Sequence, residues 1–591
     1  MNDNIPIHGG PEFIFGSESP NLLEGFVVKT PFIDNEKEHF LRLGHSVVNT
    51  LQSWSDTNYI ILALQDINNY FHNDVFKNFL VSKEIERIVL KKMKFLPDES
   101  TIQMLGCQLI DLFYETNEDL QRNLIASDTY RHFMRVLRDN STDVVLQITA
   151  LKILDKFITL EDVRDHIILD EYNLEIADQM FTCLQKFTDN TQIKQSAYSI
   201  IKHFCQDEDQ DIYKICIHKD NIDRLLDDLS LSSEEGEGCS VVAEVVRIFI
   251  YVARGSKMEG ASDYTKILME NDIHYKILRH LRKSCSEGVL NVCLRFLCIL
   301  CKEDTIKKFV YESGYLKDSL ISTMVKWSSN SGIQKTGLQL FIILAQDNGN
   351  CNLCIDDFVS QWCKIVYVAL SKHLEDSSLQ TYGCRAVAVM IENQPNAAVW
   401  IGENSQEKLT QEPIHTMCMG AMLMHRKDPK VFIAACDAIY WLAADNERLC
   451  NNLMDKNVQT VIMDGLKIHV EYHKAAEAGL KALRGLCIFN DENKRKLVLD
   501  ERIFPMISNI IDKFPQNLSI QLEATSILAC IANIDTVRYQ CFLEDIHIKI
   551  IQTLERFVEN ETIQEVGFEC LSVLCAAGLL TIFTSKAINP L

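Results

Sequence analysis

The sequence predicts an all-α fold built as a solenoid, in which about 12 helical repeats of roughly 46 residues stack on one another. Two observations predict it. An apolar residue followed by glutamine and, three places later, by a small residue recurs along the chain, and proline is scarce, at 11 of 591 residues. Because proline interrupts helices, its scarcity favours long helices over a loop-rich fold.

The recurring pattern has six clear copies. Their glutamines are Gln103, Gln147, Gln334, Gln380, Gln521 and Gln564, followed by the small residues Gly106, Ala150, Gly337, Gly383, Ala524 and Gly567. Looser copies place the small residue at Ala63, Ala197, Ala243, Cys293, Ala435 and Gly479. Successive small positions are then 43 to 52 residues apart. Armadillo and HEAT repeats have periods of roughly 40 to 47 residues, so the chain is predicted to be an armadillo/HEAT-like α-solenoid.

The residues after each small position predict a helix with one buried face, as in Leu480, Leu483 and Leu486. Glycine inside a helix costs about 1 kcal/mol relative to alanine, so the repeated glycines need an offsetting reason. Close crossing of two helices within a repeat supplies one, because a glycine lets their backbones approach.

Domain organisation follows from the repeat. We expect a mobile N-terminal arm at 1–35, which holds four prolines and four glycines, and an armadillo-repeat solenoid at 36–591. The widest spacings mark two insertions. One is the acidic stretch 227–238, DDLSLSSEEGEG, which is either a plain solvated loop, a binding site for a basic partner or a phosphorylation site at Ser232. The other spans 393–413.

The net charge of the chain restricts the classes of partner that it is expected to bind. A formal net charge of −23 repels a phosphate backbone, and no compact Lys/Arg stripe is visible along the sequence, so nucleic acid is not expected. The N-terminus has no positive segment followed by an apolar core, and no apolar run approaches the roughly 18 residues of a membrane span. We therefore expect a cytoplasmic protein with protein partners.

The 21 cysteines are expected to be reduced and to pack as small apolar side chains. Two Cys-x-x-Cys pairs, Cys298/Cys301 and Cys351/Cys354, lack the second pair that a structural zinc site needs. We expect the first pair in the core and the second in a loop. Isolated histidines, such as His415, His469 and His547, are expected at helix ends or on the surface.

No catalytic, cofactor-binding or metal-binding residue is predicted, and the chain is not expected to be an enzyme. It lacks a glycine-rich phosphate loop, an ordered pair of kinase aspartates, a Gly-x-Ser-x-Gly elbow and a His-Glu-x-x-His pair. Nuclear-import adaptors carry repeated Trp-x-x-x-Asn pairs, whereas here Trp441 is followed by Asp445.

Four segments carry a resemblance to a known family. AMLMHRKDPKVF (421–432), AEAGLKALRGL (476–486), QCFLEDIHIKII (540–551) and YVALSKHLEDSSLQTYGCRAV (367–387) resemble the armadillo region of the leucine-rich repeat (ROCO-type) serine/threonine kinases, most closely its second, Parkinson-associated vertebrate branch. In that family the armadillo solenoid precedes ankyrin, leucine-rich, GTPase-like and kinase domains and binds Rab-type small GTPases. The resemblance therefore implies a targeting arm, without the kinase activity.

The family's main Rab contact in this region uses two arginines, a leucine and a lysine, which align here with Leu374, Thr416, Gly420 and Lys456. Only Lys456 matches, and the two missing guanidinium groups are the bidentate donors that bind carboxylates.

The chain also contains an apolar stretch near its C-terminus, LSVLCAAGLLTIF (571–583), where a terminal repeat needs a polar outer face. The leading hypothesis is a non-catalytic protein-interaction scaffold that a Rab-type GTPase recruits to membranes. The alternatives are an N-terminal regulatory part of a multidomain leucine-rich repeat kinase and a homodimeric adaptor that associates through the apolar C-terminal repeat.

Overall fold

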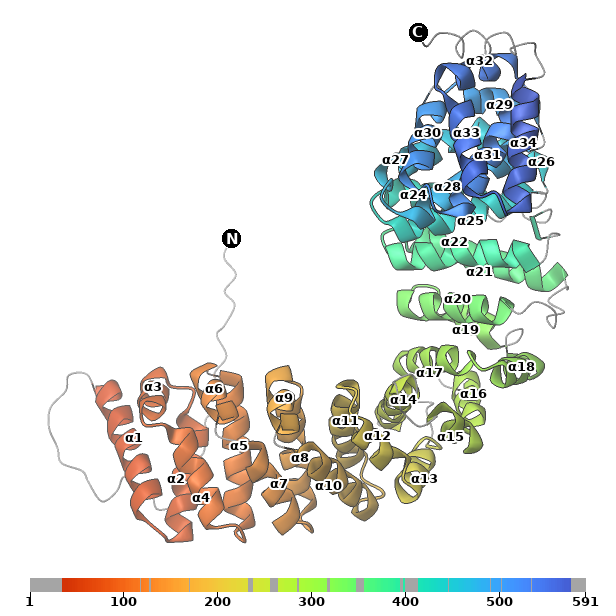
Figure 1. Ribbon diagram of the computed structural model, residues 1–591. Helices are drawn as coiled ribbons and strands as arrows, with labels where there is room; N and C mark the ends of the chain where they lie inside the picture. The colour runs from red at the N-terminus through yellow and green to blue at the C-terminus, as the bar shows by residue number, and fades with distance from the viewer. Residues whose placement is uncertain are drawn as a thin grey trace, which may run out of the picture. The chain divides into compact units, whose positions relative to one another are not determined.

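The computed structural model is helical in all the regions that it describes (Figure 1), and no β-strand occurs within them, which confirms the predicted fold class. These regions are residues 35–116, 118–126, 129–169, 171–231, 238–255, 264–283, 286–315, 319–346, 356–393, 397–398, 413–444, 446–488, 490–500, 502–532 and 534–575. None of the helices within these ranges is both long and apolar enough to cross a lipid bilayer.

The chain forms two compact units, Met1–Phe157 and Ile158–Leu591. In the first unit, the long helices α2 and α5 pack side by side, and α4 packs against α7. Its helices are α1 (Asn35–Ser53), α2 (Thr57–Tyr70), α3 (Asp74–Ser82), α4 (Ile85–Phe95), α5 (Ser100–Thr116), α6 (Glu118–Ala126), α7 (Thr129–Asp139) and nearly all of α8 (Val144–Ile158).

The second unit begins with α9 (Glu161–Leu169), α10 (Asn173–Lys186), α11 (Thr191–Gln206), α12 (Gln210–Ile217), α13 (Lys219–Asp228), α14 (Gly238–Gly255), α15 (Tyr264–Glu270), α16 (Ile273–Lys283), α17 (Glu287–Leu300), α18 (Asp304–Glu312), α19 (Ile321–Lys326), α20 (Ser331–Ala345), α21 (Asp356–Lys372) and α22 (Ser377–Asn393). It continues with α24 (Ile414–Met424), α25 (Pro429–Ala444), α26 (Glu447–Asp455), α27 (Val458–Ile468), α28 (His473–Cys487), α29 (Asp491–Val498), α30 (Ile503–Lys513), α31 (Leu518–Ile531), α32 (Asp535–Leu543), α33 (Ile546–Arg556) and α34 (Glu561–Cys575).

Two layers of helices organise this second unit. The helices α11, α14, α17, α20, α22, α25, α28, α31 and α34 each contact the next one in that order, and we call them the long-helix layer. A second layer follows the same order, because α21 contacts α24, α24 contacts α27, α27 contacts α30 and α30 contacts α33. Neighbouring repeats thus bury one another's apolar faces, as expected for a solenoid.

The recurring glutamine joins the two helices within a repeat. In all six copies its Nε2 donates hydrogen bonds of 2.7–3.1 Å to two backbone carbonyls, those of the residues ten and seven positions earlier. For Gln380 these are Leu370 and His373, at the C-terminal end of α21. The last carbonyls of a helix have no partner within that helix, so the glutamine satisfies two of them.

Close helix crossing explains the repeated glycines, which confirms the prediction. A Cβ built on Gly383 would lie 2.5 Å from Leu370 Cδ2, and one on Gly337 would lie 2.7 Å from Met324 Sδ. The three remaining glycines of the motif meet the same kind of neighbour, a side chain 13 residues earlier, at 2.4–2.5 Å; they are Gly106, Gly479 and Gly567. These distances exclude an alanine unless the neighbour shifts.

Several domain predictions fall on residues outside the described ranges. These include nearly all of the arm at 1–35, residues 232–237 of the acidic stretch, most of 393–413, and Cys351 and Cys354. Around the acidic stretch, α13 ends at Asp228 and α14 begins at Gly238. Cys298 and Cys301 are buried in the core, as predicted.

Candidate functional site

The four positions that align with the family's GTPase contact lie in consecutive repeats of the second unit. Leu374 follows α21, Thr416 and Gly420 belong to α24, and Lys456 follows the last residue of α26. Because α21 packs against α24, and α24 against α26 and α27, the fold brings all four onto neighbouring elements.

Leu374 is exposed and is held through its backbone. Its side chain is 45% exposed, and its carbonyl accepts a hydrogen bond of 2.7 Å from Nε2 of His425, the residue that ends α24. The preceding repeat contains the equivalent contact, a hydrogen bond of 3.0 Å between Nε2 of His373 and the carbonyl of Ser328. Such bonds fix one repeat against the next and leave the Leu374 side chain free for contact with a partner.

Thr416 and Gly420 are one helical turn apart on α24, but they differ in exposure. The Thr416 hydroxyl donates to the Pro413 carbonyl at 2.6 Å, and the side chain is only 7% exposed. Gly420 is exposed, and nothing lies within 4 Å of a Cβ built on it. A larger side chain would therefore fit at Gly420, whereas one at Thr416 would have to displace packed neighbours.

Lys456 is exposed at the turn between α26 and α27, directly before Asn457, whose φ of 58° is left-handed. Its charge acts on His415 at the start of α24. Burial and then the positive charge of Lys456 lower the pKa of His415 from 6.5 to about 4. Lys456 thus lies near the first turn of α24, and Leu374 is bonded to the residue at its other end.

The four residues form a strip along α24, with Lys456 and Leu374 at opposite ends. An 11-residue helix is roughly 16 Å long, so these two side chains cannot hold the same small group. The strip suits an extended surface of a protein partner. We call these four residues the α24 strip.

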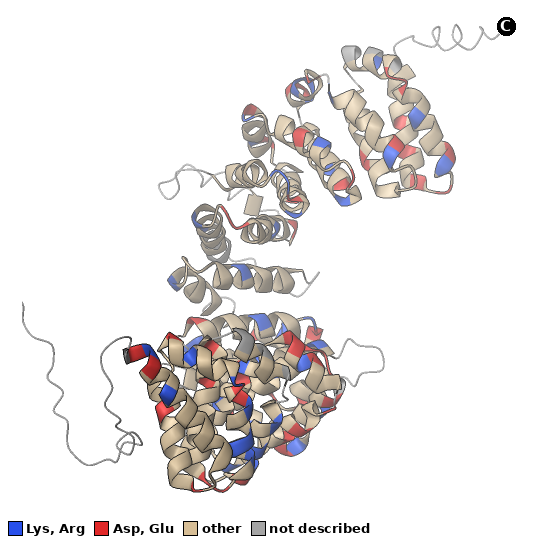
Figure 2. Cartoon of the chain, turned by 90° about the vertical axis from the view of Figure 1, so that its left-hand side faces the viewer, with Lys and Arg blue, Asp and Glu red and all other residues tan. Residues whose placement is uncertain are grey.

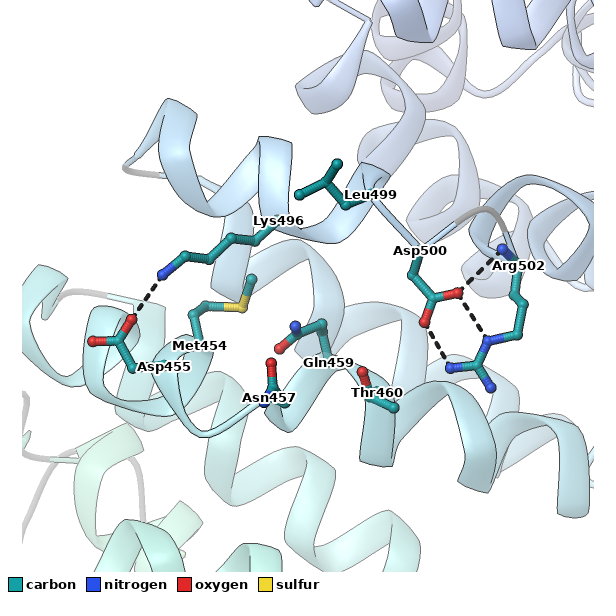
Figure 3. A pocket seen from close by; sticks show the side chains of 9 residues that line it. All are labelled: Met454, Asp455, Asn457, Gln459, Thr460, Lys496, Leu499, Asp500 and Arg502. Atoms are coloured by element: carbon teal, nitrogen blue, oxygen red, sulfur yellow. Dashed lines mark hydrogen bonds and ion pairs between the residues drawn. The ribbon is translucent and has the colours of Figure 1, made fainter.

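Sequence reasoning missed a cleft beside Lys456, which Figure 3 shows from close by. It has a volume of about 670 Å³ and lies between the α26–α27 turn and the α29–α30 turn of the next repeat. Its lining consists of Met454, Asp455, Asn457, Gln459, Thr460, Lys496, Leu499, Asp500 and Arg502. The equivalent turns are 45 residues apart in sequence, and only the stacking of repeats places them side by side.

The charges of the cleft are balanced. Lys496 pairs with Asp455 at 2.7 Å, and Arg502 pairs with Asp500 at 2.6 Å and with Asp464 at 2.7 Å. The Arg502 guanidinium lowers the pKa of Asp500 through hydrogen bonding. The cleft therefore offers no net charge to select a partner.

One other feature of the cleft favours a protein contact. Leu499 is 81% exposed at its rim and offers apolar area to a partner.

His415 and His469 stand at helix ends, as predicted. Both are also buried, at 2% and 3% exposure, because neighbouring repeats cover the ends of the second-layer helices. His547 is half-buried near the start of α33. The described residues contain no group of three or more His, Cys, Asp or Glu arranged to hold a metal ion.

Comparisons with known proteins agree with this architecture. The solved structure of an engineered protein matches 75% of this chain and 98% of its own length, with 15% identity and a TM-score of 0.55. A structure from a study of the phosphorylation switch that controls the interaction between cadherin and β-catenin matches 79% of this chain and 82% of its own, with 13% identity and a TM-score of 0.50. At these identities the likeness shows the fold alone.

The family comparison extends over most of the chain. The family model described as "LRRK2 ARM repeat" matches residues 48–538, so the solenoid predicted from the repeat and the resemblance drawn from four short segments are both confirmed. The match is to an armadillo region, a fold of protein-interaction scaffolds, and no kinase or other catalytic domain is indicated. The chain belongs to the LRRK2 ARM repeat family.

Proposed function

We propose that this chain is a cytoplasmic scaffold that binds a Rab-type small GTPase through the α24 strip and is thereby recruited to membranes. One observation carries the proposal. The residues that align with the family's GTPase contact occupy neighbouring elements of consecutive repeats, and Lys456, the one identical residue, is exposed beside the 670 Å³ cleft.

The chemistry of the strip favours a partner different from the one that the family's arginines bind. Leu374 and Gly420 are exposed and uncharged, so the strip has one cation, Lys456. A lysine is a point charge without the bidentate geometry of a guanidinium group, and the contact relies more on apolar area. Leu374, at the other end of the α24 strip, and Leu499, at the rim of the cleft, supply that area at 45% and 81% exposure.

The proposal is tested by binding of the purified chain to a panel of Rab-type GTPases, each loaded with GTP or GDP. We expect selective binding of the GTP form of at least one member. Lys456→Glu should weaken that binding by about tenfold, equivalent to about 1.4 kcal/mol. The matched control is Lys219→Glu, which makes the same charge change at an exposed position in α13 and should leave binding within about twofold.

A restoring variant sharpens the test. Leu374→Arg/Gly420→Leu returns two family residues at positions that are exposed and can take them, whereas Thr416 is buried and is left unchanged. We expect this variant to gain affinity for GTPases that bind the family's arginine-containing surface. The GTPase proposal fails if no member binds in either nucleotide state and the restoring variant binds none.

The last repeat that the structure describes supports a second candidate, self-association. Four large apolar side chains at this end of the second unit are exposed by 44–70%; they are Leu543, Ile548, Val558 and Phe568. Of the apolar stretch predicted at 571–583, residues 571–575 belong to α34, and the remainder lies outside the described ranges. Exposed apolar area of this kind favours association.

Sedimentation of the chain over a concentration series tests the second candidate. A dimer that Phe568→Glu/Val558→Glu dissociates supports association through this repeat. A chain that stays monomeric at all concentrations, or a dimer insensitive to both substitutions, contradicts it.

A further inference from the structure

Acidic and basic residues are intermixed over the helices (Figure 2). A different pattern occurs on α4 and α7 of the first unit. Each carries three cations at positions i, i+4 and i+7, which place them on one face of a helix. The row on α4 consists of Arg87, Lys91 and Lys94, and the row on α7 consists of Arg131, Arg135 and Arg138. Five of these six residues are exposed, and Arg135 is half-buried.

The two rows are in register. Each residue of the α7 row stands 44 residues after its counterpart on α4, which is also the spacing between Gln103 and Gln147. The repeat therefore places equivalent cations at equivalent positions of two stacked helices. We call these six residues the basic rows.

Packing brings the rows together on one surface. α4 and α7 are in contact, and Nδ2 of Asn140, just after α7, donates to the carbonyl of Pro97, just after α4, at 3.4 Å. His132 lies close to both rows. Its burial, and then the positive charges of Arg135 and Lys94, lower its pKa to about 4. Packed helices are about 8–10 Å apart and seven residues span about 10 Å, so the rows cover roughly 10 Å by 10 Å.

Three of the six cations, Lys91, Lys94 and Arg135, have no ion pair within the described part of the chain. Arg87 pairs with Glu84 at 3.0 Å, and both side chains are more than half exposed. Arg131 donates from Nε to the Tyr130 hydroxyl. Like charges at i, i+4 on a helix are destabilising, so the arrangement is not explained by stability.

Exposed aromatic side chains adjoin the rows at one end. Phe95 directly follows Lys94 and is 65% exposed, and Trp54 is 49% exposed. Lys92 connects them, because its Nζ donates to the Trp54 carbonyl at 2.8 Å and lies 5.8 Å from the centroid of the Phe95 ring. The surface thus combines a block of cations with apolar anchors, the composition of a recognition surface.

We propose that the basic rows and the adjoining Phe95 and Trp54 form a docking surface for an acidic segment of a partner protein. Carboxylates of the segment pair with the rows, and an apolar residue packs on Phe95. Four of the six cations are arginines, whose planar guanidinium groups bind carboxylates in a bidentate manner. This surface lies in the first unit and is separate from the α24 strip, so it does not depend on the proposed GTPase contact.

Size and charge favour a short acidic segment over a membrane or a nucleic acid. The rows extend over only about two helical turns of two helices, which a segment of about ten residues covers. A longer polyanion would continue past them onto a chain whose net charge is −23, which repels it. Charge complementarity therefore identifies an acidic protein segment as the occupant.

The test uses the full chain and a fluorescent peptide of about 12 residues, long enough for roughly 18 Å as a helix, in which glutamates alternate with leucine and phenylalanine. Fluorescence anisotropy at physiological salt measures its affinity. We expect Lys91→Glu/Arg135→Glu to weaken binding at least tenfold, and Phe95→Ser to weaken it less. The matched control is Lys219→Glu/Lys474→Glu, which changes the net charge equally at exposed positions on α13 and α28.

Three outcomes overturn the proposal. In the first, the control variant loses as much affinity as the row variant, which makes binding a matter of net charge alone. In the second, the peptide binds the row variant and the unmodified chain equally. In the third, the chain binds phosphatidylserine vesicles through the rows and leaves the peptide unbound, which assigns a lipid surface. Unchanged circular dichroism and melting temperature in the variants establish that they are folded.

Discussion

Gln380→Met tests the idea that the recurring glutamine holds each repeat together. Methionine matches glutamine in length and volume but donates no hydrogen bond. In the folded chain Gln380 is 1% exposed and donates to the carbonyls of Leu370 at 2.8 Å and His373 at 2.9 Å. The substitution removes both bonds. The His373 carbonyl keeps the Asp376 N–H as a donor at 3.3 Å, whereas the Leu370 carbonyl loses the Gln380 donor.

The expected cost follows from those two bonds. A typical hydrogen bond contributes about 0.5–1.5 kcal/mol net, and a buried polar group left without a partner costs about 1–3 kcal/mol. Because methionine keeps the packing, we expect Gln380→Met to lower the free energy of unfolding by about 2 kcal/mol. Gln521→Met should cost more, since Gln521 Oε1 also accepts from the buried Thr553 hydroxyl at 2.7 Å.

Urea unfolding followed by circular dichroism measures these changes. The control is Gln552→Met, at an exposed position in α33, which should change stability by less than about 0.5 kcal/mol. A Gln380→Met variant as stable as the control would refute the reasoning. The refutation would mean that the glutamine recurs for its packing and that its hydrogen bonds add nothing net.

Three further predictions follow from individual contacts. Asp228→Asn should destabilise the chain by about 3–5 kcal/mol in urea unfolding, because it leaves Lys194, its ion-pair partner at 2.7 Å, charged and buried. Gly420→Ala should stabilise it by up to about 1 kcal/mol by the same assay, since the position is open and alanine favours the helix. His415 has a folded pKa of about 4, below its usual 6.5, so the unfolded chain binds the proton first and stability falls as pH drops from about 6.5 to 4. His415→Leu should flatten that dependence, and Lys456→Glu should raise the His415 pKa measured by NMR.

The repeat was predictable because its signals are local in sequence. Gln380 and the two carbonyls that it bonds are ten and seven residues apart, and Gly383 and Leu370 are 13 apart. Contacts at such short separation repeat with the same residue types in each copy, which makes the pattern visible without any structure. The fold class and the close helix crossing were therefore both predicted correctly.

The candidate site was less predictable, because its geometry depends on contacts between repeats. The burial of Thr416 and His415 results from neighbouring helices that cover the start of α24. The cleft beside Lys456 brings Asp455 and Lys496 together from turns in successive repeats. Alignment locates such residues along the chain, but their exposure is set by packing that no short segment encodes.

The basic rows make the same point about charge. The basic surface is not obvious along the sequence, because three apolar residues separate Arg87 from Lys91 and the matching row is 44 residues away. Helical periodicity gathers each row on one face, and the repeat period then stacks one row beside the other. In a solenoid, therefore, a charged surface is found by comparing residues that are one repeat apart as well as residues that are close in sequence. By that comparison an acidic chain of net charge −23 still carries a concentrated basic surface.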